Sequence, residues 1–409
     1  MTKPRIISRS SLQKENEYRR NINLSIQLNR WTLKAMRVWP CSSEVSILEK
    51  YFDALMHVVY YFLISCLFVP SFLYMLLDVH NTPGKLKVFG PLSFCVMAYL
   101  KYFSLAIHAD EIRECFERIE WDWKNKRYSK DTDIMVADAI FGRRLVKICI
   151  FFMYSGFAFY YITLPINRGK VTVGNVTFIP MVFPVSNLFP DVRHSPVNEI
   201  FFGIQFMGGI VIHGVAATAC SLAAAFAVHA CGQVKVLIGW MDNLLEGRAD
   251  MSSSVDDRIS SIVSQHVRVL KFLSVTEEAL QSISFVEFTG CTLNLCLLGY
   301  HVIKEWDPND ITESLTFFIL LISLTFNIFI FCYIGELVAK YCSKIGEVAY
   351  MIDWYKLQGS RKRSVVLMIA MANTETRLTA GNMVELSLST FGDVVKTAVG
   401  FLNMLLAVS

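Results

Sequence analysis

The sequence is poor in charge and carries none of the common catalytic motifs. Of its 409 residues, 18% are charged, whereas about a quarter are charged in ordinary soluble domains. The formal net charge of +4 is too small to favour a nucleic-acid partner. No phosphate-binding loop, nucleophile elbow or zinc-protease motif occurs. We therefore expect no catalytic residue, no metal and no cofactor, and a protein that is not an enzyme.

The first 53 residues also lack an apolar run, being basic and polar instead, so a cleaved secretory signal is not expected. Over the whole chain, however, 54% of residues are hydrophobic and the mean hydropathy is +0.42. Windows of about 20 apolar residues can cross the hydrocarbon layer as helices. The sequence therefore predicts an all-α polytopic membrane protein with seven transmembrane helices, the fourth long enough to protrude, at about 54–77, 88–107, 145–166, 198–231, 283–303, 315–338 and 384–408.

Lysine and arginine are unevenly divided between the segments that separate these spans. The N-terminal segment together with 108–144, 232–282 and 339–383 holds 30 of the 39 basic residues, whereas the alternate segments hold 6. Basic segments stay on the cytoplasmic side, so we expect a cytoplasmic N-terminus and an extracellular C-terminus, the reverse of a G-protein-coupled receptor. No cysteine falls in the outer segments, and Asn175 begins a glycosylation sequon in the longest of them.

Two of the cytoplasmic segments show helical spacing of their apolar residues, at 255–273 and 339–357, and a short helix is expected at roughly 363–377. Helices that continue spans four to six into the cytoplasm, with no enzyme motif, favour an assembly surface. Packing of these stripes within one subunit is the alternative.

Few titratable side chains fall within the spans. Lys101 lies in the inner third of the second span, from which its amine can reach the interface, and Glu287 is expected near a cytoplasmic end, where the interface can solvate it. His213 and His229 in the fourth span are far apart in the sequence and have no carboxylate near them. We expect both to be interior histidines rather than metal ligands.

The last span carries Asp393 and Lys396 one helical turn apart. The two charges predict either a buried structural pair or a stretch of helix that borders water in an ion pathway. Near its end, Met404, Ala407 and Val408 recur at i, i+3 and i+4, so that one face narrows to apolar side chains. A hydrophobic gate has this composition.

The fourth span is dense in glycine, alanine and serine, which allow membrane helices to approach closely. The alternative is a chamber lined by bulky neighbours, which would suit a small apolar molecule because none of its candidate lining residues is charged. Tyr154, Tyr161 and Gln205 could each offer it a hydrogen bond. On the residues alone, core packing is the favoured interpretation. The candidate lining residues are Phe94, Met97, Tyr154, Phe157, Ala158, Tyr161, Phe202, Gln205, Phe206, Phe317, Leu320 and Leu324.

The C-terminal third resembles the ligand-tuning subunits of the insect odorant receptors. The matching residues are "FCYIGE" at 331–336, Tyr350, "WY" at 354–355, the basic run at 361–363, "LTAG" at 378–381, "SLSTF" at 387–391 and Lys396. The length, the seven spans and the inverted orientation fit this family along the whole chain. The ending typical of the related gustatory receptors is absent.

The resemblance implies a subunit of an odorant-gated, non-selective cation channel in the plasma membrane of olfactory sensory neurons. Four subunits, this one mixed with a shared odorant co-receptor, would surround a central pore. Residues 1–338, with helix extensions at 232–282, would form the bundle that binds a small apolar volatile in the outer half of the bilayer. Residues 339–409 would supply the cytoplasmic anchor, with Trp354 and Tyr355 in assembly, and the pore-lining last span, with its gate at Met404, Ala407 and Val408.

Two other functions remain as alternatives. A seven-helix receptor that signals metabotropically is opposed by the charge asymmetry. A secondary transporter would also place charges within its spans, but no inverted repeat with matching broken helices is visible in the sequence.

Overall fold

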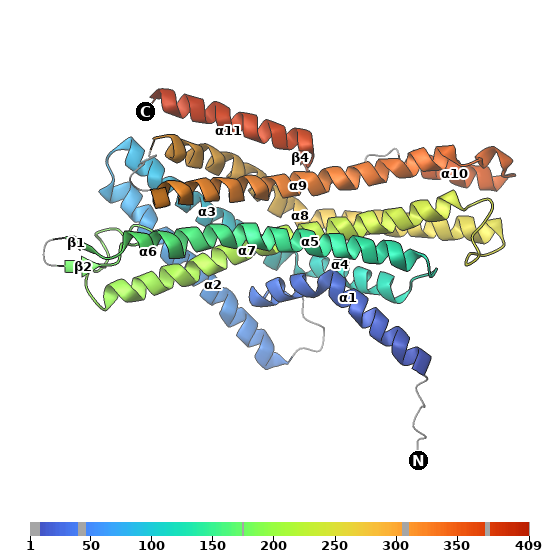
Figure 1. Cartoon of the computed structure of the whole chain (residues 1–409), viewed down its shortest axis with the longest axis horizontal. Coiled ribbons are helices and arrows are strands. Elements are labelled where there is room, and N and C mark those ends of the chain that lie inside the picture. The colour runs from blue at the N-terminus through green and yellow to red at the C-terminus, as the bar shows by residue number, and fades with distance from the viewer. Residues whose placement is uncertain (1–8, 40–45, 174–175, 305–310, 373–376, 409) are drawn as a thin grey trace, which may run out of the picture.

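The computed structural model describes residues 9–39, 46–173, 176–304, 311–372 and 377–408, and it is mainly helical (Figure 1). Within these ranges, seven segments are long and apolar enough to cross a membrane, as predicted. They are α2 with η1 (Ile47–Leu73, Tyr74–Asp78), α3 (Thr82–Ile107), α5 with η2 and α6 (Asp131–Ala158, Phe159–Thr163, Leu164–Arg168), α7 (Val197–Asp242), α8 (Val255–Lys304), α9 (Ile311–Met351) and α11 (Leu388–Val408).

The remaining elements lie beside or beyond these segments. They are α1 (Arg9–Ala35), α4 (Ala109–Lys124), the 3₁₀ turn η3 (Trp354–Lys356), α10 (Ser360–Ala372) and two antiparallel strand pairs, β1–β2 (Val171–Val173, Val176–Phe178) and β3–β4 (Thr379–Ala380, Val384–Glu385). The β1–β2 pair and α10 stand at opposite ends of the long axis (Figure 1).

Helix α7 is the centre of the bundle. In its most apolar stretch 94% of the residues are buried, and the helix packs against α1, α2, α3, α5, α8 and α9. Its glycines permit these contacts: Gly208 faces Leu67 of α2, and Gly209 faces the ring of Tyr161. The small residues of the fourth span therefore pack the core, as their composition predicted.

The helices continue far beyond a bilayer. At 1.5 Å per residue, the 46 residues of α7 extend about 69 Å and the 50 of α8 about 75 Å, whereas the hydrocarbon layer is about 30 Å thick. The buried guanidinium of Arg258 holds the connection between them by donating hydrogen bonds of 2.8 Å to the carbonyl oxygens of Leu244, Leu245 and Ser252. The expected protrusion of the fourth span is confirmed.

Two expected boundaries were wrong. Helix α9 ends at Met351 rather than near 357, because the chain turns through η3 and thereby buries Leu357 in the core. The last span begins at Leu388 rather than 384, because Val384 and Glu385 pair with the preceding strand. The division expected at residue 338 falls inside α9, so it marks a change of expected role along one continuous helix.

The approach of α9 to the strand pair that precedes α11 requires a glycine. A Cβ on Gly335, within the "FCYIGE" motif, would collide with the carbonyl oxygen and the Cβ of Leu386. Leu386 is itself buried and donates its amide to Leu378, 2.9 Å away. Gly335 therefore sets how closely the start of α11 can lie against the bundle.

We predict that Gly335→Ala destabilises the protein by about 1–3 kcal/mol, because the overpacked backbone must move. The measurement is thermal unfolding of the purified protein in detergent. Gly239→Ala on α7 is the matched control, since a Cβ there meets nothing within 4 Å and alanine favours a helix. Equal effects of the two substitutions would contradict this account.

Candidate ligand-binding site

A cavity of about 620 Å³ lies at the end of the bundle that carries the β1–β2 pair. Its walls come from η1, α3, the end of α5 with η2 and α6, α8 and the first half of α9, and α7 contributes His213. The volume falls within the range of about 300–1,000 Å³ that is typical of small-molecule sites. Most of the lining is apolar or aromatic, with a few polar groups between.

The roof of the cavity is the segment 180–184, which the first turns of α7 hold in place. The side-chain amide of Gln205 accepts a hydrogen bond from the backbone N–H of Phe183 at 3.0 Å and donates one to its carbonyl oxygen at 2.8 Å. Asn198 makes the same pair of bonds, both 3.0 Å, to Ile179. Ser71 on α2 donates to the carbonyl of Pro184 at 2.8 Å.

Five of the twelve expected lining residues border this cavity, namely Phe94, Tyr161, Phe317, Leu320 and Leu324. The other seven lie outside the lining. Phe157, Tyr154 and Phe206 form an aromatic layer behind it, since the Phe157 ring lies 5.2 Å from Tyr161 and 5.3 Å from Phe206.

The remaining four are placed as follows. Met97 packs against Gly290 below the cavity, and Ala158 and Phe202 are half-buried away from it. Gln205, which was expected to bond a ligand, bonds Phe183 on both sides of its amide instead.

The expectation of an uncharged lining was also wrong. Glu313 at the start of α9 pairs with Arg168 at 2.7 Å and with Lys87 at 3.7 Å, and all three residues border the cavity. Asp78 borders it as well and accepts a hydrogen bond of 2.7 Å from the side-chain amide of Asn187. These residues lie just outside the predicted apolar windows, before the start or after the end of one, and only the folded chain brings them to one place.

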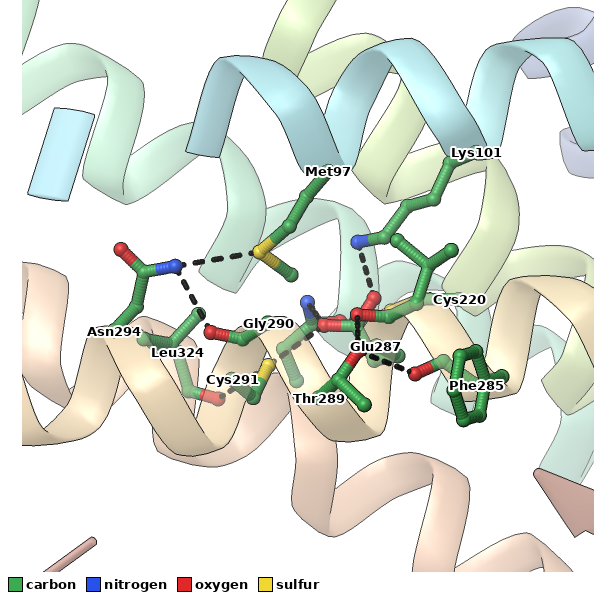
Figure 2. A network of polar contacts seen from close by, with 12 residues as sticks. Met97, Lys101, Cys220, Phe285, Glu287, Thr289, Gly290, Cys291, Asn294 and Leu324 are labelled. Atoms are coloured by element: carbon green, nitrogen blue, oxygen red, sulfur yellow. Dashed lines mark hydrogen bonds and ion pairs between the residues drawn. The ribbon is translucent and has the colours of Figure 1, made fainter. Parts of the chain in front are cut away.

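A second feature lies below the cavity, within the membrane-spanning part of the bundle. Lys101 on α3 and Glu287 on α8 form an ion pair in which the side chains are 1% and 0% exposed (Figure 2). Both had been expected to reach the interface. They are instead satisfied by each other, because a charge removed from water is stable only with a partner and further hydrogen bonds.

The carboxylate of Glu287 accepts further hydrogen bonds, one from its own helix and one from α9. Cys291 donates its thiol at 2.8 Å, and Asn327 on α9 donates its side-chain amide to the same oxygen. The amide oxygen of Asn327 in turn accepts a hydrogen bond from Cys220 on α7. Because Asn327 also borders the cavity, the ion pair and the cavity share a residue.

The last helix is the least buried of the seven, with 11% of its apolar window covered. Val394 and Ala398 pack towards α8 and α9, whereas Asp393, Lys396 and Met404 are exposed. Asp393 and Lys396 do pair, at 3.4 Å, but with exposed fractions of 67% and 82%, so the pair is not buried within one chain.

The other candidate residues lie far from the cavity or outside the described side chains. Ala407 is exposed, whereas Val408 ends α11 with its side chain outside the described part. Trp354 is half-buried and Tyr355 is exposed on η3, not on a continuous helix as expected. Asn175 lies outside the described residues.

Comparisons with known proteins agree on one family. A family model described as "7tm Odorant receptor" matches residues 81–399. Odorant receptor 82a of Drosophila melanogaster is 21% identical over 56% of this chain and 56% of its own length. Odorant receptor 10 of Aedes albopictus is 23% identical over 42% of this chain and 46% of its own length. The chain thus aligns with only about half of these relatives.

Similar folds are also known among solved structures. The insect olfactory receptor OR5 from Machilis hrabei in complex with eugenol matches with a TM-score of 0.79 and 14% identity, over 94% of this chain and all of that one. A structure described only as that receptor matches with a TM-score of 0.76 over the same shares of the two chains. At this identity the likeness shows the fold.

We predict that Lys101→Met strongly destabilises the protein, by about 3–5 kcal/mol, because Glu287 is left as a buried charge without its cation. The double variant Lys101→Met/Glu287→Gln should recover much of this loss, since a glutamine oxygen can still accept from Asn327. Thermal unfolding in detergent and yield at the cell surface are the measurements. If the double variant were no more stable than Lys101→Met, the unpaired charge of Glu287 would not be the cause of the instability.

Proposed function

Because the chain belongs to the odorant receptor family, we propose that it is the odorant-binding subunit of a ligand-gated, non-selective cation channel. A small, largely apolar volatile would bind in the cavity and thereby open a central pore. The last helices of four subunits would surround this pore. A shared odorant co-receptor would supply the partner subunits. The protein would act in the plasma membrane of olfactory sensory neurons.

The observation that carries this proposal is the two-sided character of α11. Val394, Ala398 and Leu402 face the bundle, whereas Asp393, Lys396, Gly400, Met404 and Ala407 share the opposite, exposed face. An ammonium group that faced lipid at mid-membrane would cost at least about 2.5–3.5 kcal/mol. A water-filled pathway or a neighbouring subunit on this face removes that cost, so the helix is best suited to an assembly around a pore.

The same face changes character along its length. Asp393 and Lys396 stand at its first half, and Met404 and Ala407 at its second half. A wet, charged approach followed by an apolar ring is how pores gate by dewetting. Val408 is proposed as part of this gate from the family motif alone.

The end of the molecule that carries α10 supports an anchor between subunits. Tyr350, Met351 and Tyr355 are 64%, 72% and 60% exposed, and Leu367 on α10 is 62% exposed. The charge pattern favours a cytoplasmic position for this end, where these apolar groups of a single chain would face water. Contact with the matching ends of other subunits would cover them. We propose that Trp354 and Tyr355 contribute to this contact, and that Asn175, on the outer side, is glycosylated.

We expect odorant-evoked cation currents from cells that express this chain with the co-receptor, and none from cells that lack the co-receptor. Phe317→Ala should shift the effective concentration of active odorants by about tenfold, since a lining ring is removed. Ile200→Ala, at a position 56% exposed on α7, is the control. Stoichiometric odorant uptake without current would favour a transporter instead, and an extracellular N-terminal tag would overturn the orientation.

For the pore, we predict that Met404→Ser changes basal current or ion selectivity, because a polar side chain wets the apolar ring. Lys396→Ala should alter conductance or assembly more modestly. Val399→Ser, exposed on a different face of α11, should change permeation least. Current–voltage curves with surface delivery confirmed would decide this. Unchanged permeation in the Met404 variant would remove this face of α11 from the pore.

A further inference from the structure

His213 is the polar residue that α7 contributes to the cavity. Its side chain is only 5% exposed, and three aromatic rings surround it. The ring centroids of Phe94, Phe157 and Tyr161 lie 5.4, 5.6 and 5.8 Å from that of the imidazole. A buried imidazole among aromatic rings, with no carboxylate paired to it among the described residues, is held in the neutral form.

One of the two imidazole nitrogens is already used. Nδ1 lies 3.0 Å from the carbonyl oxygen of Gly209, one helical turn earlier. A carbonyl oxygen can only accept, so Nδ1 carries the proton. In the neutral imidazole the other nitrogen then has a bare lone pair and can only accept. His213 therefore offers the cavity an acceptor, Nε2.

Two buried amides of the lining, those of Asn294 and Asn327, have partners within the protein. Asn294 accepts a hydrogen bond from Ser93 at 2.7 Å and donates one to Gly290 at 2.9 Å. Asn327 donates to Glu287 and accepts from Cys220. Both amides are therefore committed to contacts between the helices, whereas no hydrogen bond from a described residue reaches Nε2 of His213. Nε2 is thus an acceptor that a molecule in the cavity can use.

We propose that this receptor is tuned to volatiles that carry a hydroxyl group, an alcohol or a phenol, whose O–H donates to Nε2 of His213. The inference rests on the proposed function, because it names the ligand class for that same cavity. An ether, ester, ketone or hydrocarbon of the same size has no donor. It would displace water from Nε2 without replacing the hydrogen bond, which lowers affinity.

The test compares isomeric pairs of probes, benzyl alcohol with anisole and octanol with heptyl methyl ether. In cells that also express the co-receptor, the alcohol of each pair should be about tenfold more potent than the ether, as expected for one lost hydrogen bond at a buried acceptor. In His213→Phe this ratio should fall to about one, through loss of potency for the alcohol. In His213→Asn, which restores a side-chain acceptor, part of the preference should return.

Leu320→Val is the matched control, because it reshapes the lining without changing a polar atom. It should shift both members of each pair together and keep their ratio. Alcohol and ether of equal potency in the wild type, or an alcohol preference that survives in His213→Phe at the cell surface, would overturn the proposal.

A second measurement separates this inference from the proposed channel function. Ligand binding raises the thermal stability of the purified protein whether or not a pore opens, so the two probes can be compared on the wild-type chain in detergent. A larger shift with benzyl alcohol, in the absence of any odorant-evoked current, would retain the assignment of His213 and reject the channel role. Equal shifts for the two probes, with currents present, would reject the assignment and retain the channel.

Discussion

The ion pair between Lys101 and Glu287 is the interaction on which the arrangement of the bundle depends. Neither charge can reach water, so each must stay where the other can neutralise it. This condition fixes α3 against α8. The hydrogen bond from Asn327 to the same carboxylate adds α9, and the contact of Cys220 with Asn327 adds α7. The polar contacts thereby hold four helices at one depth relative to one another. In hydrocarbon the hydrophobic effect does not drive helices together, so it does not fix their relative depth.

The cavity and the last helix both contact the helices that carry this polar cluster. Asn327 faces both the ion pair and the cavity, while α8, which carries Glu287, also packs against α11 through Gly299 and Leu402. A molecule that moved the cavity floor would thus act on a helix that contacts the proposed pore. The route is short and consists of described contacts. A route of this kind couples two sites when it has two discrete arrangements that both sites bias.

Much of the fold could be predicted from the sequence, because each membrane span is a continuous run of apolar residues. The family resemblance could be found because a motif such as "FCYIGE" is a short continuous stretch. The cavity could be predicted only in part, since hydropathy does not tell which side of an aromatic helix faces a hollow. Phe157 and Tyr161 are one turn apart, yet only Tyr161 borders the cavity. The charged residues of the cavity lining could not be predicted, because Glu313, Arg168 and Lys87 lie in three separate segments of the sequence. The role of Asn198 and Gln205 could have been found from the sequence. They are two amide side chains two turns apart at the start of an apolar helix, where each needs a hydrogen-bonding partner.

Those two amides have a consequence for how such a receptor diversifies. Gln205 hydrogen-bonds only backbone atoms of Phe183 in the roof, and Asn198 hydrogen-bonds only backbone atoms of Ile179, the residue before it. The path of the roof is therefore independent of which residues it displays. A substitution at Phe183, whose ring is buried, can reshape the chamber while the scaffold above it keeps its course. If odorants bind in this cavity as proposed, a change of side chain in this segment would alter the shape of the site while the backbone hydrogen bonds that hold the segment stay in place.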